Sequence, residues 1–388
     1  KVMSLIIKPR RKLAIVTTTV LQVNFFLVPH LKALHEEFEV TLILNNDFPD
    51  LLASLDLPVK THFVNIQRKV SPVKDLITLF QLILYFRRHR FDMIHSVNPK
   101  AGLLAMLAAW LVRTPVRAHI FQGEVWANKT GVWRFILRNL DRLVSFCATH
   151  LTVVSHSERQ VLINEKIISA SKSRVLAHGS IGGVDLDKFK PEPAIRKKLR
   201  AQHGYAPDKV VFMYLGRLTR EKGLEELARA FSEIAVSHPQ VCLHLVGPDE
   251  DDILDLYKPL LHQYPSRVRV LPFSKQPNVD LQVADVLMLP SHREGFGVVV
   301  IEAAALGVPS IGSRIYGISD ALLEGVTGLM FSARSSVELA KTMTQMLNPT
   351  LRHRLGHAAR QRVEIEFDQK LVLSAFVEYH HTLLKGVK

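Results

Sequence analysis

Residues 286–302 read Val-Leu-Met-Leu-Pro-Ser-His-Arg-Glu-Gly-Phe-Gly-Val-Val-Val-Ile-Glu, and this stretch decides the fold. An apolar strand, Val286 to Leu289, ends at Pro290-Ser291, and a glycine-rich turn then leads into an apolar helix. In open parallel α/β sheets, ligands bind at the carboxyl ends of the strands, where the N–H groups of a following helix attract anions. The stretch therefore predicts a parallel α/β sheet with a binding site in this turn.

Two carboxylates, Glu294 and Glu302, bracket the turn. The two residues are eight positions apart, which is about two helical turns at about 3.6 residues per turn, so we expect both side chains to lie on nearly the same face. Two solvated surface glutamates are the ordinary interpretation of such a pair. Because Glu302 lies in the otherwise apolar run 298–306, where a charge is costly without a partner, the pattern favours a functional role.

A second strand-to-helix junction carries two cations, Arg217 and Lys222. They follow the apolar strand 210–215 and precede a helix that starts near Leu224. A guanidinium offers paired contacts to phosphate oxygens and an ammonium offers a point charge, so the junction suits a diphosphate. An exposed basic loop is the alternative.

Strands and helices alternate along the whole chain, in two successive sets, which is the βαβ pattern of parallel sheets. A proline-rich seam near residues 189–193 separates the sets. We predict an N-terminal domain over 1–190, a C-terminal domain over 191–368 and a last amphipathic helix over 369–388. The strand-like runs are Leu13–Thr17, Val40–Leu44, Met93–His95, Val116–Phe121, Leu151–Ser155, Val175–Ala177, Val210–Leu215, Val241–Val246, Val268–Leu271, Val286–Leu289 and Pro309–Ile311; the helical runs include Val28–Glu36, Leu224–Ile234, Ala321–Leu323 and Val337–Leu347.

Composition agrees with two folded domains, since 388 residues with 47% hydrophobic content can form two cores. The two cysteines, Cys147 and Cys242, lie in or beside apolar segments and suggest buried thiols in a reducing compartment. No signal peptide is expected, because the apolar piece near the start, residues 5–7, is too short.

The positive charge is concentrated in the first half of the chain. Residues 1–190 hold 26 Lys+Arg against 14 Asp+Glu, whereas residues 191–388 hold 24 against 22. This asymmetry indicates an anionic partner for the first half, either nucleic acid or an acidic membrane surface.

Two apolar stretches bear on that choice. Neither residues 75–86 nor residues 101–112 reach the roughly 20 residues needed to span a bilayer. We interpret 101–112 as a core helix. The stretch 75–86, followed by the Arg87 to Arg90 cluster, is either a core helix or a helix that lies in a membrane interface.

Together these blocks resemble the retaining glycosyltransferases of family 4, and specifically their capsule and O-antigen branch. The resemblance extends over residues 11–380, nearly the whole chain. It is carried by Gly216-Arg217-Leu218, Lys222-Gly223, Leu245-Val246-Gly247, Ala284-Asp285, the stretch from Val286 to Glu302, Gly307-Val308-Pro309, the block 95–102 and the block 179–189. It implies the GT-B fold, in which two Rossmann-like domains face a central cleft and the last helix crosses back to the first domain.

The resemblance also implies roles for individual residues. Arg217 and Lys222 would bind the donor diphosphate, Glu294 the sugar and Glu302 the ribose, with the turn Gly295, Phe296 and Gly297 against phosphate and sugar and Ser180 as a further phosphate contact. The acceptor hydroxyl would attack from the leaving-group face, with the phosphate oxygen as base; a double displacement with Glu294 as nucleophile is the alternative. No metal or other cofactor is expected, and the acidic run Asp249 to Asp252 is interpreted as a solvated loop.

Two departures from the family pattern stand out. Gln122 occupies the position where relatives carry a histidine against the donor sugar, and it cannot take up a positive charge. His119 is interpreted as a strand residue, and Glu124 as a contributor to acceptor recognition. The glycine pair after the first strand is replaced by Thr17 to Thr19, which predict either an anion site or ordinary helix caps.

The leading hypothesis is a cytoplasmic enzyme, peripheral at the inner face of the plasma membrane. It would move a hexose or N-acetylhexosamine from a UDP-sugar to an undecaprenyl-diphosphate-linked saccharide in surface polysaccharide biosynthesis. The nucleotide sugar, the lipid-linked acceptor and an anionic membrane surface are the expected partners. A soluble transferase or phosphorylase acting on a small sugar or sugar phosphate is the second hypothesis. A nucleic-acid-binding protein on a Rossmann scaffold is the third, and the lack of a nucleic-acid motif argues against it.

Overall fold

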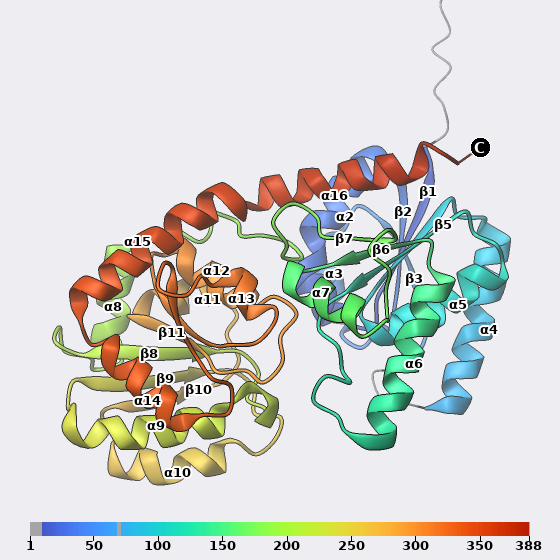
Figure 1. Cartoon of the computed structure of the whole chain (residues 1–388). Helices are drawn as coiled ribbons and strands as arrows, with labels where there is room; N and C mark the ends of the chain where they lie inside the picture. Colours follow the sequence, from blue (N-terminus) through green and yellow to red (C-terminus); the bar gives the residue numbers. More distant parts are fainter. Residues whose placement is uncertain (1–9, 68–70, 388) are drawn as a thin grey trace, which may run out of the picture. The chain divides into compact units, whose positions relative to one another are not determined.

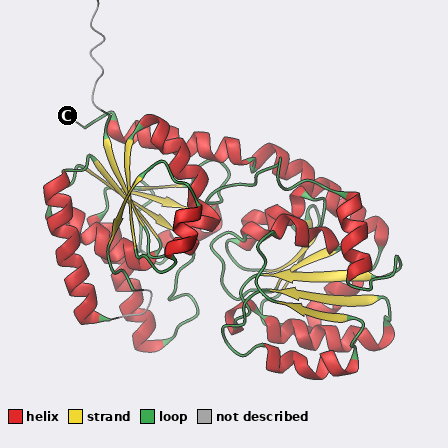
Figure 2. Ribbon diagram, turned by 180° about the vertical axis from the view of Figure 1, so that it is seen from behind, coloured by secondary structure: helices red, strands yellow, loops and turns green. Residues whose placement is uncertain are grey.

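The computed structural model describes residues 10–67 and 71–387. The chain forms two compact units, each built on a parallel β-sheet with helices on both faces (Figures 1 and 2). Unit 1 runs to Val154, resumes over Arg159–Leu176 and takes the residues from Val372 onward. Unit 2 consists of Ser155–Glu158 and Ala177–Leu371.

Unit 1 contains a seven-stranded sheet in the order β3-β2-β1-β4-β5-β6-β7, and all its strand pairs are parallel. The central strands are buried on both faces, as expected for a sheet covered by helices on both sides. The strands are β1 (Lys12–Val16), β2 (Glu39–Leu44), β3 (Lys60–Phe63), β4 (Met93–Val97), β5 (Val116–Phe121), β6 (His150–Val153) and β7 (Ser173–Arg174).

The helices of unit 1 fill the connections between these strands. A short π-helical segment, Val23–Leu27, joins the first two of them. They are α1 (Val20–Gln22), α2 (Val28–Glu37), α3 (Pro49–Ser54), α4 (Pro72–His89), α5 (Pro99–Leu111), α6 (Gly131–Cys147) and α7 (His156–Asn164), whose first residues belong to unit 2.

Unit 2 contains a six-stranded parallel sheet in the order β10-β9-β8-β11-β12-β13. Its strands are β8 (Val210–Leu215), β9 (Val241–Val246), β10 (Val268–Leu271), β11 (Val286–Leu289), β12 (Ser310–Ser313) and β13 (Gly328–Phe331). Its helices are α8 (Pro193–Gln202), α9 (Leu224–Ser237), α10 (Leu254–Gln263), α11 (Pro277–Asp280), α12 (Val298–Ala305), α13 (Ile318–Ala321), α14 (Ser336–Gln345) and α15 (Pro349–Glu366), with 3₁₀ turns at Arg220–Lys222 and Leu281–Val283.

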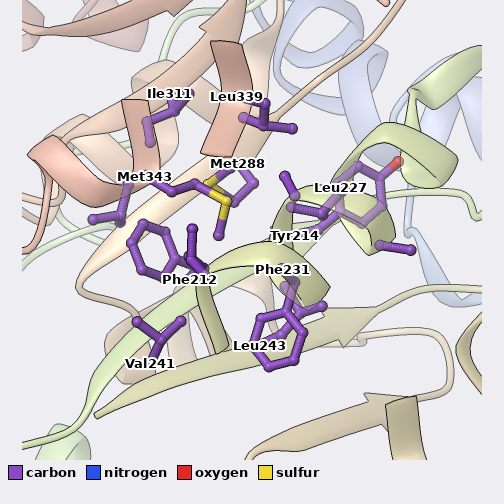
Figure 3. Close-up of a cluster of buried hydrophobic side chains, with 14 of the residues drawn as sticks. Phe212, Tyr214, Leu227, Phe231, Val241, Leu243, Met288, Ile311, Leu339 and Met343 are labelled. Carbon is purple, nitrogen blue, oxygen red and sulfur yellow. The ribbon is translucent and has the colours of Figure 1, made fainter. Parts of the chain in front are cut away.

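The core of unit 2 lies between its sheet and the helices α9 and α14 (Figure 3). Phe212 and Met288, from the adjacent strands β8 and β11, pack there against Phe231 of α9 and Met343 of α14, and all four side chains are buried. This packing fixes the strand ends that carry the site described below. Unit 1 has its own core, in which α5 lies between the sheet and the helices α4 and α6.

The last helix, α16 (Gln369–Leu384), begins in unit 2 and continues in unit 1 from Val372. There the ring of Phe376 lies 4.6 Å from the ring of His30 and 5.5 Å from that of His95. His95 Nδ1 and His380 Nε2 are 3.0 Å apart in the same buried layer. The helix thus supplies part of the core of unit 1.

The boundary between the units differs from the predicted seam. Residues 177–190, assigned above to the first domain, cluster with unit 2. The reason is a pair of backbone hydrogen bonds, from Val184 N to the Phe367 carbonyl (2.8 Å) and from Gln369 N to the Val184 carbonyl (2.9 Å). Prolines mark where a helix can start, here α8, but long-range pairing decides where a domain begins.

Several element predictions also differ from the structure. Residues 175–177 are not a strand, since β7 ends at Arg174, and the helix predicted at 321–323 lies instead at Ile318–Ala321. The strands β3 and β13 were not predicted. Between residues 10–67 and 71–387, no helix combines the length and the apolar composition needed to cross a bilayer.

Candidate active site

The candidate site is built from the loops that follow β8 and β11, adjacent parallel strands of unit 2. Gly223, at φ 66°, closes the first loop, and a Cβ on it would lie only 1.9 Å from the carbonyl oxygen of Pro290 in the second. The loops are also tied by His292 N, which donates to the Glu221 carbonyl (2.8 Å), and by the Arg293 guanidinium, 3.0 Å from the Glu221 carboxylate. Glycine at position 223 is therefore what allows the two predicted motifs to meet.

Lys222 and Glu294 meet at this junction. The Lys222 ammonium donates to Glu294 Oε1, and the Ser291 hydroxyl donates to the same oxygen at 2.9 Å. Both partners of the ion pair are largely buried, with side-chain exposures of 19% and 17%. Within the described chain, no residue donates to the second oxygen, Oε2. Glu294 is thus oriented through one oxygen and can accept from a ligand through the other.

A third loop, after β12, supports the turn from behind. A Cβ on Gly317, at φ 81°, would lie 2.5 Å from the Glu294 carbonyl oxygen and 2.7 Å from that of Gly295. Gly317 N donates to the Ser157 hydroxyl (2.7 Å), and Ser157 also hydrogen-bonds Asp320. The turn that carries Glu294 therefore packs directly against the backbone of Gly317. A larger residue at position 317 would displace the turn.

Arg217 lies at the end of β8 but is more exposed than Lys222. Its guanidinium forms a 2.8 Å ion pair with Glu250, in which the two side chains are 43% and 37% exposed. Exposed ion pairs contribute only about 0–1 kcal/mol, so Arg217 can exchange this partner for a phosphate at little cost.

Glu250 belongs to the acidic run 249–252, which lies in an exposed loop between β9 and α10, as predicted. The run is exposed, yet it is ordered by specific contacts. The Asp249 carboxylate accepts from the backbone N–H groups of Ile253 and Leu254, at 2.8 and 3.1 Å, and Asp251 accepts from Arg220 N at 2.9 Å. These contacts anchor the loop beside Arg217 and the turn 220–222.

The glycine turn opens into α12. Gly297 caps the helix at φ 83° without any side-chain cap, which leaves the first N–H groups of α12 for another acceptor. Phe296 is buried, and its ring lies 5.3 Å from the ring of Phe367. The predicted turn residues Gly295, Phe296 and Gly297 are thus placed beside the helix start, with Phe296 as the apolar anchor.

The same phenylalanine, Phe367, fixes both ends of the loop that contains Ser180. The ring of His178 lies 6.5 Å from it, and Val184 N donates to its carbonyl. Ser180 is buried and adopts φ 71°, a left-handed conformation that a non-glycine residue rarely adopts; its hydroxyl accepts from Gly183 N at 3.2 Å. Strained backbone of this kind often marks a ligand site. Phe296 and the Ser180 loop are therefore both in contact with one residue, Phe367.

Glu302 lies in the second turn of α12, half-buried among apolar residues. Burial raises the pKa of its carboxyl group to about 7, and the positive charge of Lys188 opposes that rise. Within the described residues it accepts no hydrogen bond. A carboxyl group in such surroundings gains from hydroxyl donors, as the predicted ribose contact requires.

Gln122 belongs to unit 1, at the end of β5. Its Oε1 accepts from Gln22 Nε2 at 3.2 Å, while its own Nε2 is buried and, among the described residues, has no hydrogen-bond partner. His119, as predicted, is a buried strand residue, and its Nδ1 lies 2.8 Å from the Ser96 hydroxyl. Glu124 is buried in the following loop.

The three threonines after β1 prove to be local structural groups. Thr19 caps α1, because its hydroxyl accepts from Leu21 N, and it donates to the Asp47 carboxylate at 2.5 Å. The hydroxyls of Thr17 and Thr18 accept from Asn98 Nδ2 at 3.1 and 2.9 Å. Because the Asp47 carboxylate also accepts from Val20 N, at 2.9 Å, an acidic side chain already occupies this helix start.

The structure brings together most of the predicted residues of unit 2 and adds others that the sequence did not reveal. Four of these additional residues act through contacts that span tens of residues or more: Gly317, Phe367, Lys188 and Glu250. The fifth, Ser291, lies three residues before Glu294, and that spacing is a signal that sequence reasoning could have used. Over residues 10–67 and 71–387, no group of three His, Cys, Asp or Glu side chains is arranged to hold a metal.

Both halves of the chain match known protein families. Residues 195–362 match the model of group 1 glycosyl transferases, and residues 28–179 match that of the glycosyl transferase 4-like domain. The chain is 30% identical over 333 residues to the capsular polysaccharide biosynthesis glycosyltransferase CapM of Staphylococcus aureus, covering 84% of this chain and 85% of that protein. It is 28% identical over 296 residues, 73% of each chain, to an Escherichia coli UDP-Gal:alpha-D-GlcNAc-diphosphoundecaprenol alpha-1,3-galactosyltransferase.

Solved structures show the same fold. Anabaena Alr3699/HepE, crystallised with UDP and glucose, superimposes with a TM-score of 0.78 at 20% identity, covering 96% of this chain and all of that one. WaaG, a glycosyltransferase of lipopolysaccharide biosynthesis, gives a TM-score of 0.73 at 15% identity, covering 95% and 99% of the two chains.

Proposed function

Because the chain belongs to the family 4 glycosyltransferases of the GT-B fold, in their capsule and O-antigen branch, we propose a specific reaction for it. It transfers a hexose or N-acetylhexosamine, with retention of configuration, from a UDP-sugar to an undecaprenyl-diphosphate-linked saccharide. The relative from E. coli, which by its name uses UDP-Gal and a diphosphoundecaprenol acceptor, supports this donor and acceptor class. The observation that carries the proposal is the Lys222–Glu294–Ser291 cluster at the mouth of the glycine turn.

In this proposal, unit 2 binds the donor. Lys222 and Arg217 neutralise the diphosphate, the free N–H groups at the start of α12 add donors, and Glu302 accepts from the ribose hydroxyls. Breakage of the anomeric C–O bond leaves a nucleoside diphosphate, whose developing negative charge the two cations stabilise. Because these side chains supply positive charge, we expect the reaction to need no metal ion.

Retention follows, in this proposal, from attack on the same face that the diphosphate leaves. The departing phosphate oxygen takes the acceptor proton, and Glu294 orients the sugar through Oε2. The alternative, in which Glu294 is a nucleophile, makes a different prediction: Glu294 would carry a glycosyl group after donor is added without acceptor. Mass spectrometry of the intact protein under those conditions separates the two mechanisms.

The acceptor and the membrane are assigned to unit 1. By sequence, unit 1 contains 26 Lys+Arg and 12 Asp+Glu, whereas unit 2 contains 24 of each, so the whole net charge of +14 belongs to unit 1. A surplus confined to one unit suits a lipid surface with acidic headgroups. We therefore propose a peripheral enzyme at the inner face of the plasma membrane.

The test is a transfer assay on the purified chain. UDP-sugars are offered singly with a short-chain polyprenyl-diphosphate-linked GlcNAc, and in parallel with free sugars and sugar phosphates. We expect one UDP-sugar to be transferred to the lipid-linked acceptor with an α linkage by NMR, at the same rate with and without EDTA. Transfer to free sugars or sugar phosphates alone would instead establish the soluble enzyme, and loss of rate in EDTA would contradict the metal-independent chemistry.

A further inference from the structure

Helix α6 of unit 1 exposes an unusual amount of apolar surface. Six of its side chains, which we call the α6 face, are exposed by 36–72%: Val132, Trp133, Phe135, Ile136, Leu143 and Phe146. At about 100° per residue they occupy an arc of about 160° on one side of the helix. Trp110 of α5, itself 42% exposed, extends the face, since its ring lies 5.9 Å from that of Phe146.

The arginines of α6 lie outside this arc and attach the helix to the rest of unit 1. Arg134 and Arg138 both pair with the Glu165 carboxylate, and their guanidinium carbons lie 4.9 and 5.8 Å from the ring of the buried Trp126. Arg142 donates to the carbonyls of Glu165 and Lys166. Because these cations are engaged within unit 1, the outward side of α6 is dominated by its apolar residues.

Helix α4 differs in this respect. It also exposes apolar side chains, among them Leu76 and Phe80 at 68% and 60%. The side chains of its exposed cations Lys74, Arg87 and Arg88, and of Arg90 directly after it, however, form no hydrogen bond or ion pair with any residue in the described parts of the chain. Helix α5 packs against both α4 and α6, so the two surfaces belong to one side of the unit 1 sheet (Figure 1).

We propose that the α6 face inserts into the interfacial region of an acidic phospholipid bilayer and anchors unit 1 by apolar burial, while the free cations of α4 supply electrostatic attraction. This rests on the proposed function, of which the membrane is a part. Trp and Phe side chains on an otherwise apolar helical face suit the headgroup boundary. A second copy of the chain suits it less, because two units that each carry a surplus of 14 positive charges repel one another.

The two attachments differ in their response to salt. Attraction between exposed charges is screened as the Debye length falls from about 10 Å at ~0.1 M to about 3 Å at ~1 M salt. Burial of apolar side chains is not weakened by added salt in this way. Binding that persists at high salt therefore reports on the α6 face, and the part that salt removes reports on α4.

The experiment measures co-sedimentation of the full chain with phosphatidylglycerol/phosphatidylcholine vesicles at ~0.1 M and ~1 M NaCl. The test variant is Phe135→Ser/Phe146→Ser. The matched control is Val236→Ser/Ile365→Ser, which removes apolar side chains of similar exposure, 78% and 71%, from unit 2. We expect the test variant to lose binding at high salt about tenfold and the control to bind like the wild type. Wild-type binding by the test variant at high salt would overturn the proposal.

Trp133 provides a second readout. It is 65% exposed, and Trp110 and Trp126 are the other tryptophans of the chain. We expect a blue-shifted emission on addition of vesicles and quenching by brominated lipid, both largely lost in Trp133→Phe. If gel filtration instead shows that the wild type is a dimer and that Phe135→Ser/Phe146→Ser is a monomer, the α6 face binds a second copy of the chain and the proposal is wrong.

The proposed function is tested separately in the same variants, with a short-chain acceptor that needs no vesicle. Transfer at the wild-type rate by Phe135→Ser/Phe146→Ser shows that its fold and active site are intact. Failure of vesicle binding by the wild type, with transfer preserved, would sink the membrane inference and leave the enzymatic activity standing.

Discussion

Lys222 and Glu294 lie 72 residues apart in the sequence and share a charge-assisted hydrogen bond in unit 2. Ser291 donates to the same carboxylate oxygen, so the ion pair is fixed in direction and the second oxygen stays available. A partly buried pair of this kind loses much when one partner is removed, because the other charge is left without compensation. Each member of the cluster can thus be tested against a matched exposed pair elsewhere in the unit.

Lys222→Ala should lower turnover by about 10², as expected for loss of one group that stabilises developing charge. The control is Arg229→Ala, which breaks an exposed pair with Glu225 on α9 and should leave the rate unchanged. Initial rates with the preferred UDP-sugar give the comparison. Full turnover by Lys222→Ala would remove the lysine from the mechanism.

Arg217→Ala should weaken UDP binding about tenfold, in line with the loss of one charged hydrogen bond. Glu250→Ala should do the opposite on a smaller scale, because it releases Arg217 from its exposed ion pair. Calorimetric titration with UDP measures both. Equal affinity in Arg217→Ala and the wild type would show that this arginine does not reach the diphosphate.

Glu302 should make both stability and UDP binding depend on pH. Its pKa is raised from 4.5 to about 7 in the folded chain, so the folded state holds the proton more tightly than the unfolded state. The contribution of Glu302 to the free energy of unfolding is then highest below pH ~4.5 and falls by up to about 3 kcal/mol as the pH rises through ~7. Glu302→Gln should abolish this fall, as urea titrations near pH ~5 and ~8 would show.

Ionisation of Glu302, which lowers stability, should strengthen UDP binding, because an ionised carboxylate accepts hydrogen bonds from ribose hydroxyls more strongly. We therefore expect UDP affinity to rise between pH ~6 and ~8 in the wild type and to stay flat in Glu302→Gln. A parallel rise in both proteins would assign the effect to another group, such as the phosphate itself.

Gly317→Ala should damage the site more than Gly325→Ala, although both glycines have positive φ, 81° and 71°. A Cβ at 317 meets the carbonyls of Glu294 and Gly295, whereas one at 325 meets nothing within 4 Å. Gly325→Ala should cost about 1 kcal/mol from backbone conformation alone. Gly317→Ala should add a large loss of turnover; similar rates in the two variants would contradict the support assigned to Gly317.

The buried histidines under α16 should make unit 1 sensitive to acid. Burial lowers the pKa of His380 to about 4 and that of His95 well below 6.5; His95 faces His380, His119 and His30, and His381 lies near His380. The unfolded chain takes up these protons first, so the free energy of unfolding should fall from pH ~6.5 downward, by about 1.4 kcal/mol per unit for each histidine.

His380→Gln should reduce that slope by the one proton that this histidine takes up on unfolding. Denaturant titrations at several pH values give the slopes. Tryptophan fluorescence is a signal specific to unit 1, since Trp110, Trp126 and Trp133 all lie there. Identical slopes for His380→Gln and the wild type would mean that the buried layer does not titrate on unfolding.

Much of the fold could be predicted from the sequence because parallel sheets buried on both faces leave continuous apolar runs, as in β8 and β11. The edge strand β3 (Lys60–Phe63) was missed because it is short and mostly exposed, so no apolar run marks it. The strained conformation of Ser180 and the support from Gly317 arise from long-range contacts that spacing alone does not reveal.

The charges of the site show the same limit. The sequence indicated Arg217 and Lys222 as a matched pair, but the structure gives them different environments, one exposed beside Glu250 and one largely buried against Glu294. Likewise, the asymmetry of net charge was visible, whereas the α6 face was not. Which side of an amphipathic helix turns outward depends on Glu165 and Trp126, which lie on other elements.

The passage of α16 from unit 2 into unit 1 bears on how hybrid enzymes can be assembled from this chain and a relative. An exchange at the single point 176/177 would supply unit 1 with a foreign terminal helix against His30 and His95. A hybrid with two crossovers, one at 176/177 and one near Leu371, takes all of unit 1, including its part of α16, from one parent. The hydrophobic core of each unit then comes from a single protein. We therefore expect donor and acceptor specificity to be exchanged independently only in the second design.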